Sequence, residues 1–128
     1  MAVYYIGSYD ITDPIQFRKY PPLVAALLPR YGGRVLALDT AAYAIEGNAR
    51  TMNTIIQFPS RDAALGLYND PDYQEAKRIR ESATANRTRV IFHRRIRTIS
   101  SISVRRTPQS IAISIFAADA EVIGVSEQ

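Results

Sequence analysis

The chain has 128 residues, 47% hydrophobic and 22% charged, which is the composition of one globular domain with a sizeable core. It contains no cysteine, which excludes disulfides, thiolate catalysis and cysteine-based metal sites. The net charge is +4. No stretch reaches the ~20 apolar residues of a membrane span, and the first residues do not form a signal peptide. We therefore expect a soluble, cytoplasmic protein.

The first half of the chain predicts strands separated by one interrupted helix. Tyrosine, β-branched residues and apolar alternation favour three strands, at residues 2–9, 34–40 and 51–58. Asp13 can cap the helix after the first strand, and Pro14 suits its first turn, where no backbone N–H is needed. We expect Pro21-Pro22 to break or kink this helix after Tyr20, and an apolar helical turn to continue from there to Gly32-Gly33.

The second half predicts two capped helices and a fourth strand. Ser60 caps a helix over residues 61–69, and Asp70 with Pro71 begins another over residues 72–85. The segment RTRVIF (87–92) favours a strand. The whole order is that of the ferredoxin-like split βαβ fold, class α+β, with a four-stranded antiparallel sheet and helices on one face. The other, apolar face needs cover, which predicts a homodimer that packs sheet to sheet.

Residues 95–128 follow the predicted domain of residues 1–94 as a C-terminal extension. Isoleucine alternates with small residues at 98–104 and 110–116, which predicts a β-hairpin, and a further short strand is open at 120–125. The alternatives are an ordered pair of strands and a poorly ordered extension. We favour an ordered, β-rich extension that makes oligomer contacts, because its isoleucines would be costly in water.

Two arginine clusters, at residues 93–97 and 105–106, raise the question of a nucleic-acid partner. They lack the interleaved aromatic residues and glycines of a typical nucleic-acid surface. We favour a solvated basic face, or arginines paired with the acids of a partner subunit, over nucleic-acid binding.

Five linked segments resemble the Domain of Unknown Function 1330 family: YDITDPIQFRKY, GGRVLALD, IEGN, IIQFPSRDAALGLYNDPDYQEAKRIR and the closing strand, over about residues 2–92. The resemblance implies a dimeric α+β barrel of the ferredoxin-like type, related in shape to antibiotic-biosynthesis monooxygenases and stress-response barrel proteins. It implies no established reaction. Pro21-Pro22 departs from the smoother first helix expected of the family, and residues 95–128 lie beyond the resemblance.

The candidate catalytic residue is Glu46, in the segment AIEGN. It follows an apolar run, so its carboxyl could point into the barrel and act as a general acid or base. The alternative is a turn residue that pairs with Arg34 or Arg80. No nucleotide-binding, P-loop, esterase or zinc-protease motif occurs, and His93 is the single histidine. We expect neither a metal nor a cofactor.

The candidate ligand-binding residues are Asp13, Tyr20, Tyr68, Tyr73 and Arg80. Asp13 has the simpler interpretation of a helix cap. The rings of Tyr68 and Tyr73 flank one turn and pack, with hydroxyls that remain free to bond. Arg78 and Arg80 are two apart on a helix, so only one of them can face a pocket.

Two functions remain open on this pattern. The first is a homodimeric barrel that binds a small organic molecule, with cofactor-free enzymatic activity as one form of it. The second is a non-enzymatic assembly or regulatory module whose tail mediates oligomerisation.

Overall fold

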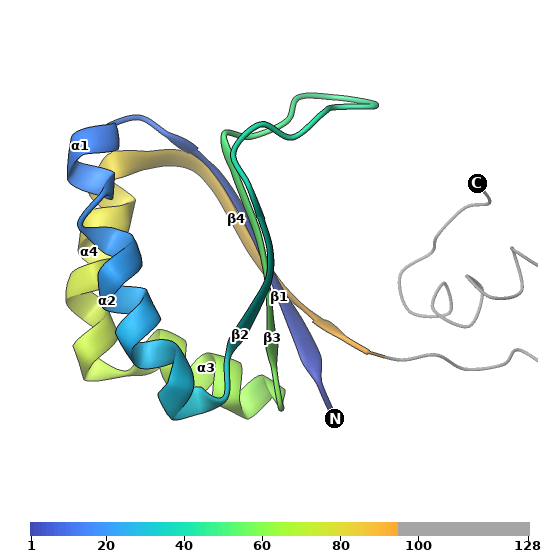
Figure 1. Cartoon of the computed structure of the whole chain (residues 1–128), viewed down its shortest axis with the longest axis vertical. Helices are drawn as coiled ribbons and strands as arrows, with labels where there is room; N and C mark the ends of the chain where they lie inside the picture. Colours follow the sequence, from blue (N-terminus) through green and yellow to red (C-terminus); the bar gives the residue numbers. More distant parts are fainter. Residues whose placement is uncertain (95–128) are drawn as a thin grey trace, which may run out of the picture. The chain divides into compact units, whose positions relative to one another are not determined.

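The computed structural model describes residues 1–94, in which four antiparallel strands form one sheet with the helices on one side of it (Figure 1). In chain order the strands are β1 (Val3–Ile11), β2 (Arg34–Asp39), β3 (Met52–Phe58) and β4 (Thr84–His93). Their order across the sheet is β2-β3-β1-β4, with antiparallel pairing at every step. This confirms the predicted α+β, ferredoxin-like class.

The helices fill the two connections that cross the sheet. Between β1 and β2 the chain forms α1 (Pro14–Phe17), α2 (Tyr20–Leu27) and the 3-10 turn η1 (Leu28–Tyr31). Between β3 and β4 it forms α3 (Arg61–Asn69), the 3-10 turn η2 (Pro71–Tyr73) and α4 (Gln74–Ala83). Within residues 1–94, no helix has the length and apolar composition needed to cross a bilayer.

The first helix is interrupted earlier than the sequence predicts. We expected Pro21-Pro22 to end a helical segment after Tyr20, but α1 stops at Phe17 and α2 begins at Tyr20. The two prolines lie in the first turn of α2, where a missing N–H costs no hydrogen bond. They therefore open the second segment and do not close the first.

The last strand begins earlier than expected. Thr84 already has extended backbone angles at the end of α4, so β4 starts there and not at residue 87. The Thr84 hydroxyl donates a hydrogen bond of 2.6 Å to the Arg80 carbonyl, which satisfies an acceptor at the helix end. The predicted strands of residues 98–104 and 110–116 lie outside the described residues and stay a prediction.

The core lies between the sheet and the helices because the central strands β1 and β3 turn a mostly apolar face to the helices. In β1 the residues Val3, Tyr5, Gly7 and Tyr9 alternate onto the helix side, as the period of two requires. Phe58 from β3 is 2% exposed and lies in the same core. The arrangement places aromatic side chains of the strands directly opposite those of α1 and α2.

A carboxylate ties η1 to η2 at one end of this core. The side chain of Asp70 accepts hydrogen bonds from the Asp72 amide (2.7 Å) and from the Tyr31 hydroxyl. Arg30 approaches the same carboxylate and also pairs with Asp72 at 2.8 Å. The Tyr31 hydroxyl and the Asp72 amide hold the pKa of Asp70 below its ordinary value.

This depressed pKa predicts how stability depends on pH. The stabilisation is complete above the unfolded-state pKa of about 4 and is lost as the pH falls through the lower folded-state pKa. In urea unfolding at fixed protein concentration, we expect Asp70→Asn to be less stable than wild type at neutral pH and to approach it in acid. The exposed Asp62→Asn serves as control. A difference in free energy of unfolding between wild type and Asp70→Asn that stays constant at all pH values would contradict this.

Candidate functional site

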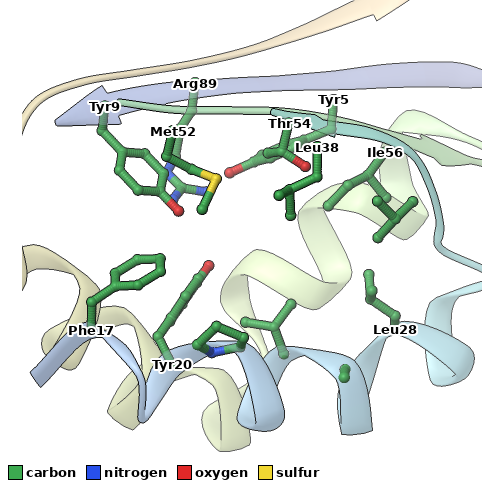
Figure 2. A pocket seen from close by; sticks show the side chains of 14 residues that line it. Tyr5, Tyr9, Phe17, Tyr20, Leu28, Leu38, Met52, Thr54, Ile56 and Arg89 are labelled. Atoms are coloured by element: carbon green, nitrogen blue, oxygen red, sulfur yellow. The ribbon is translucent and has the colours of Figure 1, made fainter. Parts of the chain in front are cut away.

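A cavity of about 230 Å³ lies between the sheet and the first two helices (Figure 2). Its walls are mostly apolar and aromatic, and its polar groups are three tyrosine hydroxyls, one threonine and one arginine. The lining residues are Tyr5, Tyr9, Phe17, Tyr20, Pro21, Val24, Ala25, Leu28, Val35, Leu38, Met52, Thr54, Ile56 and Arg89. None of them is an acid or a histidine, so the cavity carries an excess of positive charge.

On the sheet side of the cavity, a glycine separates the two tyrosines of β1 that line it. Gly7 lies between Tyr5 and Tyr9 on the helix-facing side of β1, and it pairs with Arg89 on β4. A Cβ at Gly7 would lie 3.3 Å from the Tyr5 ring and from the Thr54 methyl group, so the glycine gives these neighbours room. The Arg89 guanidinium carbon lies 5.3 Å from the centre of the Tyr5 ring and 5.6 Å from that of Tyr9. Both distances are within the range of a cation–π contact.

A β-bulge turns Arg89 toward the helices. The pairing of β1 with β4 shifts between Asp10–Ala85 and Ser8–Thr88, so β4 carries an extra residue there. Asn86 takes a left-handed backbone angle of φ 55°, which asparagine tolerates better than most residues, and donates a hydrogen bond of 2.9 Å to Asp10. Without the extra residue, the alternation that starts at buried Thr84 would place Arg89 on the opposite face.

The helix side of the cavity holds a buried pair of tyrosines. The hydroxyls of Tyr20 and Tyr73 are 2.8 Å apart and share a hydrogen bond. Figure 2 shows the Tyr20 hydroxyl rising from the helix into the space below the sheet. Burial raises the pKa of Tyr20 well above its ordinary value, and burial raises the pKa of Tyr9 to about 12 although the nearby Arg80 opposes it. Both phenols are therefore protonated at neutral pH and can donate hydrogen bonds.

Among residues 1–94, the buried Arg80 and the half-buried Arg89 have no acidic partner in this region. Arg80 is 1% exposed, and its guanidinium carbon lies 5.8 Å from the centre of the Tyr20 ring. Among residues 1–94, the Nε and Nη2 atoms of Arg80, the Nε of Arg89 and the hydroxyl of Tyr5 are buried without a hydrogen bond. The ion pairs of this part of the chain involve other arginines. Burial lowers the pKa of Arg89 to about 10, which leaves it charged at neutral pH.

Two further spaces adjoin the same wall. One of about 210 Å³ is lined by residues of β1, β4 and α3, and a small one of about 30 Å³ lies against Tyr20 and Tyr73. Tyr5 and Arg89 line both of these spaces as well as the main cavity. They are therefore the polar groups that a molecule in any of the three would meet.

The structure brings together four of the five residues expected to bind a ligand. Tyr20, Tyr73 and Arg80 form one cluster, and the Tyr68 ring packs at 5.8 Å from that of Tyr73. Tyr20 lines the main cavity, whereas Arg80 lines none of the three spaces. Asp13 is exposed and accepts a hydrogen bond from the Gln16 amide, so it caps α1 away from the cavity.

Glu46 does not lie where we expected it. We expected its carboxyl to point into an apolar cavity, but it is exposed on the loop between β2 and β3. Tyr43 and Ile45 on the same loop are each 92% exposed. Neither alternative partner is present: Arg34 bonds to Gln57, and no ion pair within residues 1–94 includes Glu46. The single chain therefore keeps Glu46 away from the cavity.

Sequence reasoning missed the sheet side of the site, which consists of Tyr5, Tyr9 and Arg89. One signal was present. Tyr5 and Tyr9 each lie two residues from Gly7, so all three share one face of a strand. An arginine inside RTRVIF was a second signal, but its direction depends on the bulge at Asn86, which alternation alone does not reveal. Among residues 1–94, no group of three or more acids or histidines converges as a metal site would.

The tyrosine pair gives a test of how tightly this region is built. Tyr20→Phe or Tyr73→Phe leaves one buried hydroxyl unpaired, so we expect each to lower the free energy of unfolding by about 1–3 kcal/mol. The double variant should cost less than the sum, because no orphaned hydroxyl remains. The exposed Tyr43→Phe should be neutral in the same denaturant titration. Strictly additive losses would show that the two hydroxyls are not coupled.

Comparison with solved structures finds chains of the same fold. A protein of unknown function from Rhodopseudomonas palustris is 17% identical, with a TM-score of 0.63 over 71% of this chain and 80% of that chain. A dimeric ferredoxin-like protein of unknown function from Jannaschia sp. CCS1 is 10% identical, with a TM-score of 0.60 over 73% and 99%. SnoaB, a cofactor-independent oxygenase from Streptomyces nogalater, is 14% identical, with a TM-score of 0.53 over 84% and 96%.

At these identities the likeness shows the fold alone. A comparison with curated proteins finds no match. A family model described as Domain of unknown function (DUF1330) matches residues 2–93, which is most of the chain and nearly all of its described part. The chain belongs to the DUF1330 family.

Proposed function

We propose that this protein is a homodimer in which each subunit binds one small, flat organic molecule in the cavity between the sheet and the helices. The observation that carries the proposal is the cavity itself, about 230 Å³ of space between aromatic and aliphatic walls. Such walls favour a ligand with an apolar body, and a few convergent polar groups fix its orientation.

The size of the cavity limits the ligand. Sites for drug-sized molecules commonly have volumes of ~300–1,000 Å³, so this cavity suits a body of one or two rings. Such a body would meet the ring faces and edges of Tyr9, Phe17 and Tyr20. The ring centre of Phe17 lies 5.8 Å from that of Tyr9 and 5.6 Å from that of Tyr20. Aromatic pairs at these distances stabilise one another and a stacked guest.

Turnover without a cofactor is the enzymatic form of this proposal. SnoaB is a cofactor-independent oxygenase of the same fold, and that likeness supports cofactor-free chemistry only by analogy of fold. Glu46 is exposed in the single chain, so the proposal assigns it no chemical step.

The open face of the sheet supports the dimer. No helix of residues 1–94 covers this side (Figure 1), and the register places Tyr4, Ile6, Val90 and Phe92 on it. Phe92 is 47% and Val90 37% exposed. Apolar surface of this kind is stabilised when a second sheet covers it. The dimeric neighbour from Jannaschia sp. CCS1 shares this fold.

A matched pair of variants tests the cavity. Ala25 lines it and Ala26, the next residue on α2, does not. In equilibrium dialysis with 4-nitroanisole, a neutral aromatic probe, we expect wild type and Ala26→Phe to bind equally. Ala25→Phe should fill part of the space and bind at least about tenfold more weakly, a difference of ~1.4 kcal/mol. Equal binding by both variants, or no binding by wild type, would refute the proposed site.

A charge on the open face tests the dimer. Phe92→Asp would bury a carboxylate between the two sheets, so we expect its mass in light scattering to fall to that of one chain. Ile15→Asp is the control, because Ile15 is 74% exposed on α1, which lies on the helix side of the sheet. A wild-type protein with the mass of one chain would reject the dimer, as would a Phe92→Asp variant that keeps the mass of two.

A further inference from the structure

We propose that Arg89 and Tyr5 form an anion site within the cavity, which selects the conjugate base of a weakly acidic organic molecule such as a phenol or an enol. The proposal rests on the proposed ligand cavity and adds the chemical class of the ligand. We call Arg89 and Tyr5, together with the Tyr9 ring that contacts the guanidinium, the Arg89 site.

The Arg89 site has hydrogen-bond donors that no group in residues 1–94 uses. The Nε of Arg89 and the hydroxyl of Tyr5 are both buried, and among residues 1–94 neither has a hydrogen-bond partner. Both residues line the main cavity and the two spaces beside it. An unpaired buried donor costs about 1–3 kcal/mol, so an oxygen that accepts from either of them is stabilised there.

Within residues 1–94, the surroundings of Arg89 supply no counter-charge. The linings of the three spaces hold no acidic residue. The rings of Tyr5 and Tyr9 contact the guanidinium by their faces and so stabilise the cation, but they leave its Nε without an acceptor. An anion would neutralise the charge, which a neutral ligand or water does not.

Dimerisation through the open face of the sheet would leave the charge of Arg89 without a counter-charge. Arg89 pairs with Gly7 on the helix side of the sheet, whereas the open face that we assign to the partner carries Val90 and Phe92. Side chains of adjacent residues on a strand point to opposite faces. The partner's sheet therefore lies on the far side of the strands from Arg89.

The walls of the main cavity determine which kind of acidic ligand the site would bind. The walls of the main cavity are apolar and aromatic, so most of the ligand is an uncharged flat body with one acidic oxygen. No lining residue is a carboxylate or an imidazole, and the phenols of Tyr9 and Tyr20 have raised pKa values. The site therefore lacks a base of its own, and the proton of the ligand passes to solvent as the anion binds.

The pKa of a bound probe tests this directly. 4-Nitrophenol absorbs differently as phenol and as phenolate, so its titration can be followed with the full-length protein in excess. We expect its pKa to fall by about one unit or more on binding, which corresponds to at least tenfold tighter binding of the phenolate. Arg89→Gln should abolish the shift, and Arg89→Lys should retain part of it. The exposed Arg78→Gln should behave as wild type.

The neutral probe separates this inference from the function beneath it. If 4-nitroanisole and 4-nitrophenol both bind to wild type but the bound and free pKa values of 4-nitrophenol agree, the anion site is refuted and the cavity stands. If neither probe binds, the proposed function fails and the inference fails with it. Should Arg89→Gln not fold in a thermal melt, Tyr5→Phe replaces it, and a shift that Tyr5→Phe leaves unchanged would remove Tyr5 from the site.

Discussion

The pairing of β4 with β1 changes register at Asn86, and this change decides which face of the sheet receives Arg89. A strand that begins with buried Thr84 would, by alternation alone, send Arg89 to the face opposite the helices. One extra residue with a left-handed backbone reverses that, and the hydrogen bond from Asn86 to Asp10 holds the reversal in place. The charged wall of the cavity follows from this local feature, because it places the guanidinium of Arg89 against the rings of Tyr5 and Tyr9.

The helix side and the sheet side of the cavity differ in how their polar groups are paired. On the helix side, Tyr20 and Tyr73 satisfy one another, and Arg80 is buried close to Tyr20 with two nitrogens that have no partner among residues 1–94. On the sheet side, the Tyr5 hydroxyl and the Arg89 Nε are buried without a partner among residues 1–94, and both residues line the cavity. A fold that leaves buried donors unpaired gives up stability at that point, which is the pattern expected of a binding site.

The sequence predicts the fold well because the fold depends on local signals. Caps such as Ser60 and Asp70, and the strand alternation of β1 and β3, each act within a few residues. The site was predictable in part: Tyr20, Tyr73 and Arg80 do cluster, since their helices pack together. Arg89 was missed because its direction depends on a bulge, and Glu46 was misplaced because an apolar run beside it forms an exposed loop and not a cavity wall.

One strand carries both proposed properties of this protein. The odd-numbered residues of β1, among them Tyr5 and Tyr9, face the cavity, and the even-numbered Tyr4 and Ile6 face the proposed partner. Because neighbouring side chains on a strand point in opposite directions, the two surfaces share a backbone and no side chains. Association can therefore stiffen β1 and the wall of the cavity without contributing a residue to it. Substitutions on one face should alter association and those on the other face ligand binding, so the two properties can be separated within a single strand.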